Sequence, residues 1–148
     1  NPGCFSWVSL GLKNLYYNFL PIISPTEANI RQFLDQVVFY KPTHQLSEAG
    51  EQQLVDYVRL AITRYKDRTQ KPYYMGNQLN AVAVDTYLLV GTNDLLIPPH
   101  KSIRNAKKHL GNHLKAVVEF EGVNHGIECH PPAIRYIATA IQARASSA

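Results

Sequence analysis

The sequence predicts an α/β fold, with an incomplete parallel sheet of two strands in the order strand–helix–strand–helix, preceded by a helical segment. Two short apolar runs in the second half, Thr86–Val90 and Lys115–Phe120, have the length and composition of strands. Apolar residues at helical spacing lie between these runs and again after the second one. Two strands joined by a helical crossover are expected to run parallel, and the crossover is expected to be right-handed.

Composition narrows the class of protein. The chain has 148 residues, of which 45% are hydrophobic and 18% charged, as is typical of one globular domain. No apolar run approaches the roughly 20 residues that span a bilayer, which predicts no membrane partner. The net charge of +4 is scattered over helix-like segments and forms no basic stripe, which argues against a nucleic-acid partner. Two cysteines without C-x-x-C spacing favour a reducing compartment, and we expect the cytoplasm.

Residues 1–80 form the predicted helical region. The apolar opening stretch predicts one helix that ends before Pro21. The motif Ser24-Pro25-Thr26-Glu27 is typical of a capping box with proline at the first helical position, and Pro42 is expected to end that second helix. Ser47 is expected to cap a third helix.

Residues 81–148 contain the predicted strands. Thr86–Val90 is a continuous apolar run, which is typical of a parallel strand that is buried on both faces. The helix that follows is expected to end at Gly111, and Pro131 opens the last helix. The expected apolar face of that last helix consists of Ala133, Ile134, Ile137, Ala138 and Ile141.

Two ionisable residues follow the two predicted strands. Asp94 comes shortly after the first strand and His125 shortly after the second. Because the carboxyl ends of neighbouring parallel strands meet at one edge of a sheet, we expect a hydrogen bond between these side chains. A carboxylate in this position fixes the imidazole tautomer and stabilises the imidazolium, as a general base that serves a serine nucleophile requires.

The surroundings of both residues are similar to a known family. The segment Val90-Gly91-Thr92-Asn93-Asp94-Leu95-Leu96-Ile97-Pro98 resembles the G-x-x-D-x-x-x-P segment that carries the triad acid in α/β-hydrolases. The segment Phe120-Glu121-Gly122-Val123-Asn124-His125-Gly126-Ile127-Glu128 resembles that family's histidine loop, and the order of acid before histidine agrees. The resemblance implies that residues 1–80 are a lid and residues 81–148 the carboxyl-terminal part of the hydrolase core. It also implies a small-molecule substrate with an ester, thioester, amide or similar bond.

The sequence departs from the family in two places. Asn124 stands where many members have glycine before the histidine. No G-x-S-x-G motif occurs, and the surroundings of Cys4 and Cys129 do not match a nucleophile elbow either. The resemblance therefore implies that the serine and the oxyanion hole lie in a segment before Asn1, and that this chain alone is inactive.

The sequence indicates neither a metal site nor a cofactor. The remaining histidines have no H-E-x-x-H or similar spacing, which predicts no metal, and no glycine-rich phosphate motif predicts a cofactor. Glu128 precedes the last helix, where the helix dipole alone favours an acid; a structural role is preferred to one in holding His125.

The alternative is a non-catalytic, hydrolase-like interaction protein or an oligomerising fragment. In both interpretations the strand Thr86–Val90 has an unpaired edge, which predicts pairing with a missing amino-terminal half or with a second copy of the chain. A G-x-S-x-G motif upstream of Asn1 in the parent gene supports the hydrolase. A start codon close to Asn1 supports the alternative.

Overall fold

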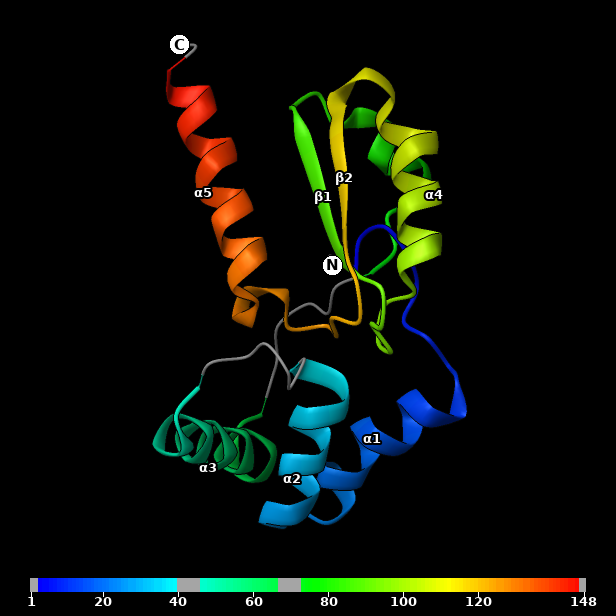
Figure 1. Ribbon diagram of the computed structural model, residues 1–148. Coiled ribbons are helices and arrows are strands. Elements are labelled where there is room, and N and C mark those ends of the chain that lie inside the picture. The colour runs from blue at the N-terminus through cyan, green and yellow to red at the C-terminus, as the bar shows by residue number, and fades with distance from the viewer. Residues whose placement is uncertain (1–2, 40–45, 67–72, 147–148) are drawn as a thin grey trace.

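The structure is a computed structural model in which residues 3–39, 46–66 and 73–146 are described. A two-stranded sheet lies between helix α4 (Pro99–Leu110) on one side and helix α5 (Pro131–Ala145) on the other. Helices α1 (Leu12–Ile23), α2 (Glu27–Phe33) and α3 (Glu48–Arg64) form a second layer beyond the carboxyl ends of the strands (Figure 1). None of the helices in these ranges is both long and apolar enough to cross a membrane.

The sheet confirms the predicted strands and their direction. Strand β1 (Thr86–Gly91) pairs in parallel with β2 (Leu114–Phe120), and Leu88 lies opposite Val117. Helix α4 makes the crossover and ends at Gly111 as predicted, where a φ of +49° suits glycine. The short 3₁₀ turn η3 (Gly111–His113) then leads into β2.

One face of the sheet is closed by α4. Leu88 and Val90 of β1 are almost fully buried against Ala106 of α4. Phe5 and Leu79, the latter in the 3₁₀ helix η2 (Gly76–Ala81), join the same cluster. Two residues from the predicted lid region therefore pack in the core of the sheet layer, next to β1.

The opposite face is more open than the sequence predicts. We expected β1 to be buried on both faces, but Tyr87 remains 39% exposed. Within α5 only Ala133 is buried, while Ile134, Ile137 and Ile141 are 40% to 64% exposed. The expectation was wrong because an open groove lies between β1 and α5, lined by residues of both elements.

The first helix differs from its predicted end. Helix α1 continues through Pro21 to Ile23 instead of ending before the proline. Proline has no N–H, so the helix lacks the hydrogen bond that residue 21 would donate, and the Pro21 ring is buried. Burial of the apolar ring offsets this loss.

The second helix begins later than predicted. Ser24 is the last residue of the α1 hydrogen-bond pattern, since its N–H donates to the Leu20 carbonyl. The hydroxyl of Thr26 therefore provides the cap and accepts from the N–H of Asn29. Ser47 is the N-cap residue of α3, as predicted, and its hydroxyl accepts a hydrogen bond from the N–H of Gly50. Pro42 lies outside the described residues.

A π-helix, η1 (Leu34–Val38), directly continues α2. Ile30, Leu34 and Phe39 pack with Val55 of α3 to form the core of the helical layer, and Cys129 lies against this cluster from the other layer. We call α1, α2, η1 and α3 the cap. The last turn of η1 faces the loop that follows β2, so the two layers meet at the ends of the strands.

Candidate functional site

The two residues that the sequence singles out meet at the carboxyl edge of the sheet. Nδ1 of His125 lies 2.9 Å from Oδ2 of Asp94, as predicted. The Asp94 side chain is fully shielded from solvent, whereas that of His125 is 33% exposed. The pair thus has a buried acid and an accessible imidazole, which is the arrangement required when the histidine acts on another molecule or segment.

The Asp94 carboxylate is oriented by its own loop. Its Oδ1 accepts hydrogen bonds from the N–H groups of Leu96 and Ile97, both at 2.8 Å. Backbone donors stabilise the negative charge of a carboxylate and fix the plane of the group. As a result Oδ2 is directed toward His125.

The arrangement at Nδ1 decides what the other ring nitrogen can do. A carboxylate accepts hydrogen bonds, so Nδ1 of His125 carries the proton in the neutral imidazole. Nε2 is then an acceptor and can take a proton from a hydroxyl group. This is the tautomer that a general base uses.

The loops that hold the pair lie against each other without room for a side chain. A Cβ atom on Gly91 would be 2.3 Å from the carbonyl oxygen of Val123 and 2.6 Å from that of Asn124. The N–H of Asn93 donates to Val123 at 3.0 Å, and the N–H of Gly122 donates to the Thr92 hydroxyl at 2.8 Å. Glycine at position 91 permits this close approach.

The histidine loop also contacts the cap, which the sequence did not predict. The N–H groups of His125 and Gly126 donate to the carbonyls of Val37 and Val38 at 3.0 and 2.9 Å. The side chain of Asn124 is buried and donates to the carbonyl of Phe39. The one available signal was Asn124 itself, a polar residue where the related motif often has glycine.

Four described residues with nucleophilic side chains, two serines and two cysteines, have contacts or surroundings of their own. The buried serines Ser6 and Ser102 hydrogen-bond to each other at 3.1 Å. Burial raises the pKa of the Cys4 thiol, and burial together with the charge of Glu128 raises the pKa of Cys129. Because thiolates rather than thiols are the reactive form, neither cysteine is an activated nucleophile.

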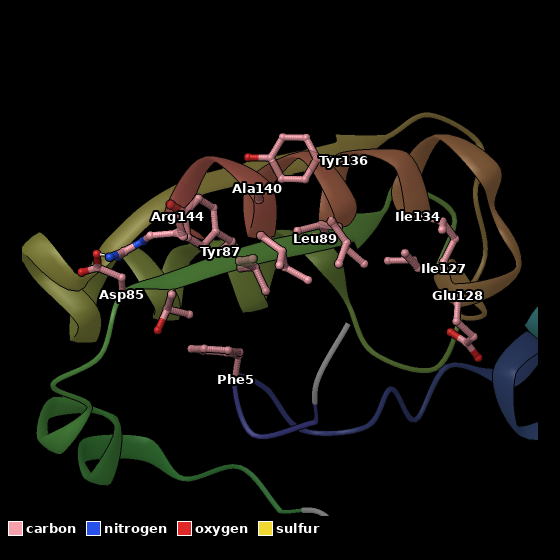
Figure 2. Close-up of a pocket in the computed structure, with 14 residues that line it drawn as sticks. Phe5, Asp85, Tyr87, Leu89, Ile127, Glu128, Ile134, Tyr136, Ala140 and Arg144 are labelled. Atoms are coloured by element: carbon pink, nitrogen blue, oxygen red, sulfur yellow. Dashed lines mark ion pairs between the residues drawn. The ribbon is translucent and has the colours of Figure 1, made fainter. Parts of the chain in front are cut away.

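An apolar groove of about 740 Å³ runs between β1 and α5. Figure 2 shows Tyr87 and Leu89 of β1 on one side of it and Ile134 of α5 on the other. Asp85 and Arg144 form an ion pair at one end, and Lys115 also pairs with Asp85 at 3.2 Å. This groove follows the outer edge of the strand.

Glu128 lies at the other end of this groove, where its side chain is exposed. Asp94, and not Glu128, forms the hydrogen bond to Nδ1 of His125. The structure thus brings Asp94 and His125 together and places Glu128 beside the groove. Among the described residues, no three His, Cys, Asp or Glu side chains are grouped so that they could hold a metal ion.

Comparisons with known proteins support the fold. No protein-family model and no curated protein sequence matches the chain. A crystal structure from Bacillus subtilis, described as that of a "putative hydrolase", is similar to it with a TM-score of 0.60 and 12% sequence identity. The match covers 95% of this chain and 47% of the Bacillus chain. The protein thus shares the α/β fold of that neighbour, and it spans about half the neighbour's length.

Proposed function

We propose that this chain supplies the acid and the histidine of a serine-type α/β-hydrolase that acts on an ester, thioester, amide or similar bond of a small molecule. The observation that carries the proposal is the 2.9 Å contact between Nδ1 of His125 and a fully buried Asp94 carboxylate. That carboxylate is oriented by two backbone N–H groups at the carboxyl ends of neighbouring parallel strands.

In the proposed reaction, Nε2 of His125 takes the proton of a serine hydroxyl as the serine oxygen attacks the carbonyl carbon of the substrate. The imidazolium then gives this proton to the leaving group, and the bond between carbonyl carbon and leaving group breaks. Water hydrolyses the acyl-serine by the same route, with His125 again as base. Asp94 stays ionised and stabilises the imidazolium in both steps.

The serine and the oxyanion hole are assigned to a polypeptide segment outside these 148 residues. The groove beside β1 supports this, because an apolar strand edge and the exposed isoleucines of α5 suit a further part of the sheet. The 47% coverage of the structural neighbour leaves room for such a part. The alternative occupant is a second copy of the chain.

The cap is proposed to be a lid, because its helices lie beyond the strand ends where the pair is located (Figure 1). No cofactor enters the proposed reaction. Two free cysteines suit a reducing compartment such as the cytoplasm.

The test has two arms. The isolated chain is treated with a fluorophosphonate probe, which phosphonylates activated serines with loss of fluoride, beside a known serine hydrolase as the positive control. We expect no labelling of the chain, because the pair lacks a nucleophile; labelling would contradict the assignment of the serine to another segment.

In the second arm, the reading frame upstream of Asn1 is determined in the source gene. A G-x-S-x-G motif in that frame is expected. A start codon close to Asn1 with no such motif, together with absent labelling, would overturn the proposal in favour of a non-catalytic protein.

A further inference from the structure

The strongest unexplained feature is the attachment of the histidine loop to the cap. The last carbonyl groups of a helix have no partners within it. In η1 the N–H of Phe39 closes the final turn on the Leu34 carbonyl at 2.7 Å, and the carbonyls that follow are directed out of the helix end. Two of them, from Val37 and Val38, accept the N–H groups of His125 and Gly126.

Asn124 completes this attachment with its side chain. Its Nδ2 donates to the carbonyl of Phe39 and, at 3.3 Å, to that of Asp35. Its Oδ1 accepts from Nδ2 of Asn93 at 2.6 Å. The carboxamide thus joins the cap, the histidine loop and the loop that carries Asp94.

The chemistry of this position requires a group that both donates and accepts. A carboxylate cannot donate to the two cap carbonyls, and an aliphatic side chain can neither donate nor accept. Asn124 is 4% exposed, and its replacement would remove the donor from its buried contact with the Phe39 carbonyl, which is costly. Glycine, the residue common in similar loops, has no side chain and would make none of these three hydrogen bonds.

The backbone of η1 packs closely against Gly126 of the histidine loop. A Cβ atom on it would be 2.7 Å from the carbonyl oxygen of Val38. A side chain at position 126 would therefore push η1 away from the histidine loop.

We infer that Asn124 is a positioning residue, which holds His125 against Asp94 only while η1 of the cap is docked on the histidine loop. The inference rests on the proposed function for its catalytic meaning, although the contacts exist without it. The consequence is that release of the cap would weaken the hydrogen bond between the acid and the base, so the docking of the cap would tune the site.

The test uses nuclear magnetic resonance on the full chain. Asn124→Leu keeps the number and branching of the side-chain heavy atoms and removes the three side-chain contacts. Amide hydrogen exchange of His125 and Gly126 is expected to accelerate at least about tenfold, because hydrogen bonds that close the loop are lost. The low-field Nδ1 proton resonance of His125, which reports its bond to Asp94, is expected to broaden or disappear.

Arg31→Met is the matched control. Arg31 pairs with Glu27 and Glu51 inside the cap and does not touch the histidine loop. This variant is expected to leave both signals of His125 unchanged. If Asn124→Leu retains the Nδ1 resonance and the amide protection of the unmodified chain, the inference is wrong.

A second measurement covers the case in which Asn124→Leu does not fold. In the unmodified chain, the amides of His125, Gly126 and Phe39 are expected to exchange through one common opening, with the same dependence on denaturant. Separate openings for the cap and the histidine loop would overturn the inference. Since these readouts need no activity, an intact, cap-dependent pair in a protein without hydrolase activity would refute only the proposed function.

Discussion

Asp94 and His125 are 31 residues apart in the sequence, yet Nδ1 of the histidine lies 2.9 Å from Oδ2 of the aspartate. The contact follows from the parallel pairing of β1 and β2, which places the ends of both strands at one edge of the sheet. The acid is buried and fixed by backbone N–H groups, while the imidazole is partly exposed. A sheet edge of this kind joins a fixed carboxylate to an accessible imidazole.

The tight contact between the Asp94 loop and the histidine loop predicts that one added methyl group at Gly91 lowers the stability of the fold. Gly91→Ala would place a Cβ atom 2.3 Å from the backbone oxygen of Val123, so one loop must move. We expect unfolding to become easier by about 1–3 kcal/mol, the usual range for overpacking, as measured by urea denaturation.

Gly11→Ala is the control for this substitution. A Cβ atom at position 11 meets only the hydroxyl of Ser9, at 3.4 Å, and φ there is −63°. We expect this change to alter the free energy of unfolding by less than about 0.5 kcal/mol. Equal effects of the two substitutions would refute the close approach of the loops.

The buried His130 predicts how stability depends on pH. Burial, and then the nearby charge of Arg135, lowers the pKa of His130 below its ordinary value of 6.5. The unfolded chain therefore binds a proton that the folded chain resists, and the free energy of unfolding falls as the pH drops below about 6.5. The ring packs edge-on against Phe120 with centroids 5.3 Å apart.

His130→Gln removes this titration, and urea denaturation at pH 7.5 and 5.5 measures the result. The loss of stability between the two pH values is expected to be smaller in His130→Gln than in the unmodified chain. His100→Gln, at an exposed position, should keep the full loss. A pH dependence that is the same in all three proteins would contradict the role of His130.

The open side of β1 predicts association. Its edge and the exposed isoleucines of α5 line one apolar groove, so the isolated chain is not expected to persist as a monomer at micromolar concentration. Sedimentation velocity measures this. Ile141→Lys, in the groove, should weaken association at least about tenfold, since a charge would have to be buried.

Ile23→Lys is the control for the groove. Ile23 is 79% exposed on α1 of the cap and lies outside the groove, so its replacement should leave association unchanged. A stable monomer of the unmodified chain would refute the prediction. Equal weakening by Ile23→Lys would move the interface to the cap.

The sequence predicts the sheet and its acid–histidine pair well because both depend on local patterns. The apolar runs Thr86–Val90 and Lys115–Phe120 indicate strands, and parallel pairing then determines which loops meet. The end of α4 at Gly111 is equally local, since a positive φ favours glycine.

Features that depend on distant contacts were not predicted. Whether Pro21 ends a helix depends on what buries its ring, and the choice of Thr26 over Ser24 as a cap depends on where α1 ends. The contact between Asn124 and the carbonyl of Phe39 links residues 85 positions apart, which no periodicity reveals. The openness of β1 likewise depends on the position of α5.

The central claim is that His125 is the base and Asp94 the acid of a serine hydrolase. It is tested most directly by the rate of fluorophosphonate labelling of the complete protein encoded by the reading frame that contains these 148 residues. We expect His125→Ala and Asp94→Asn each to lower that rate by orders of magnitude, about 10⁴-fold being the loss for the carboxylate in the serine-protease triad. A loss smaller than about tenfold for either variant, with the protein still folded, would contradict the claim, because a triad base or acid cannot be that dispensable.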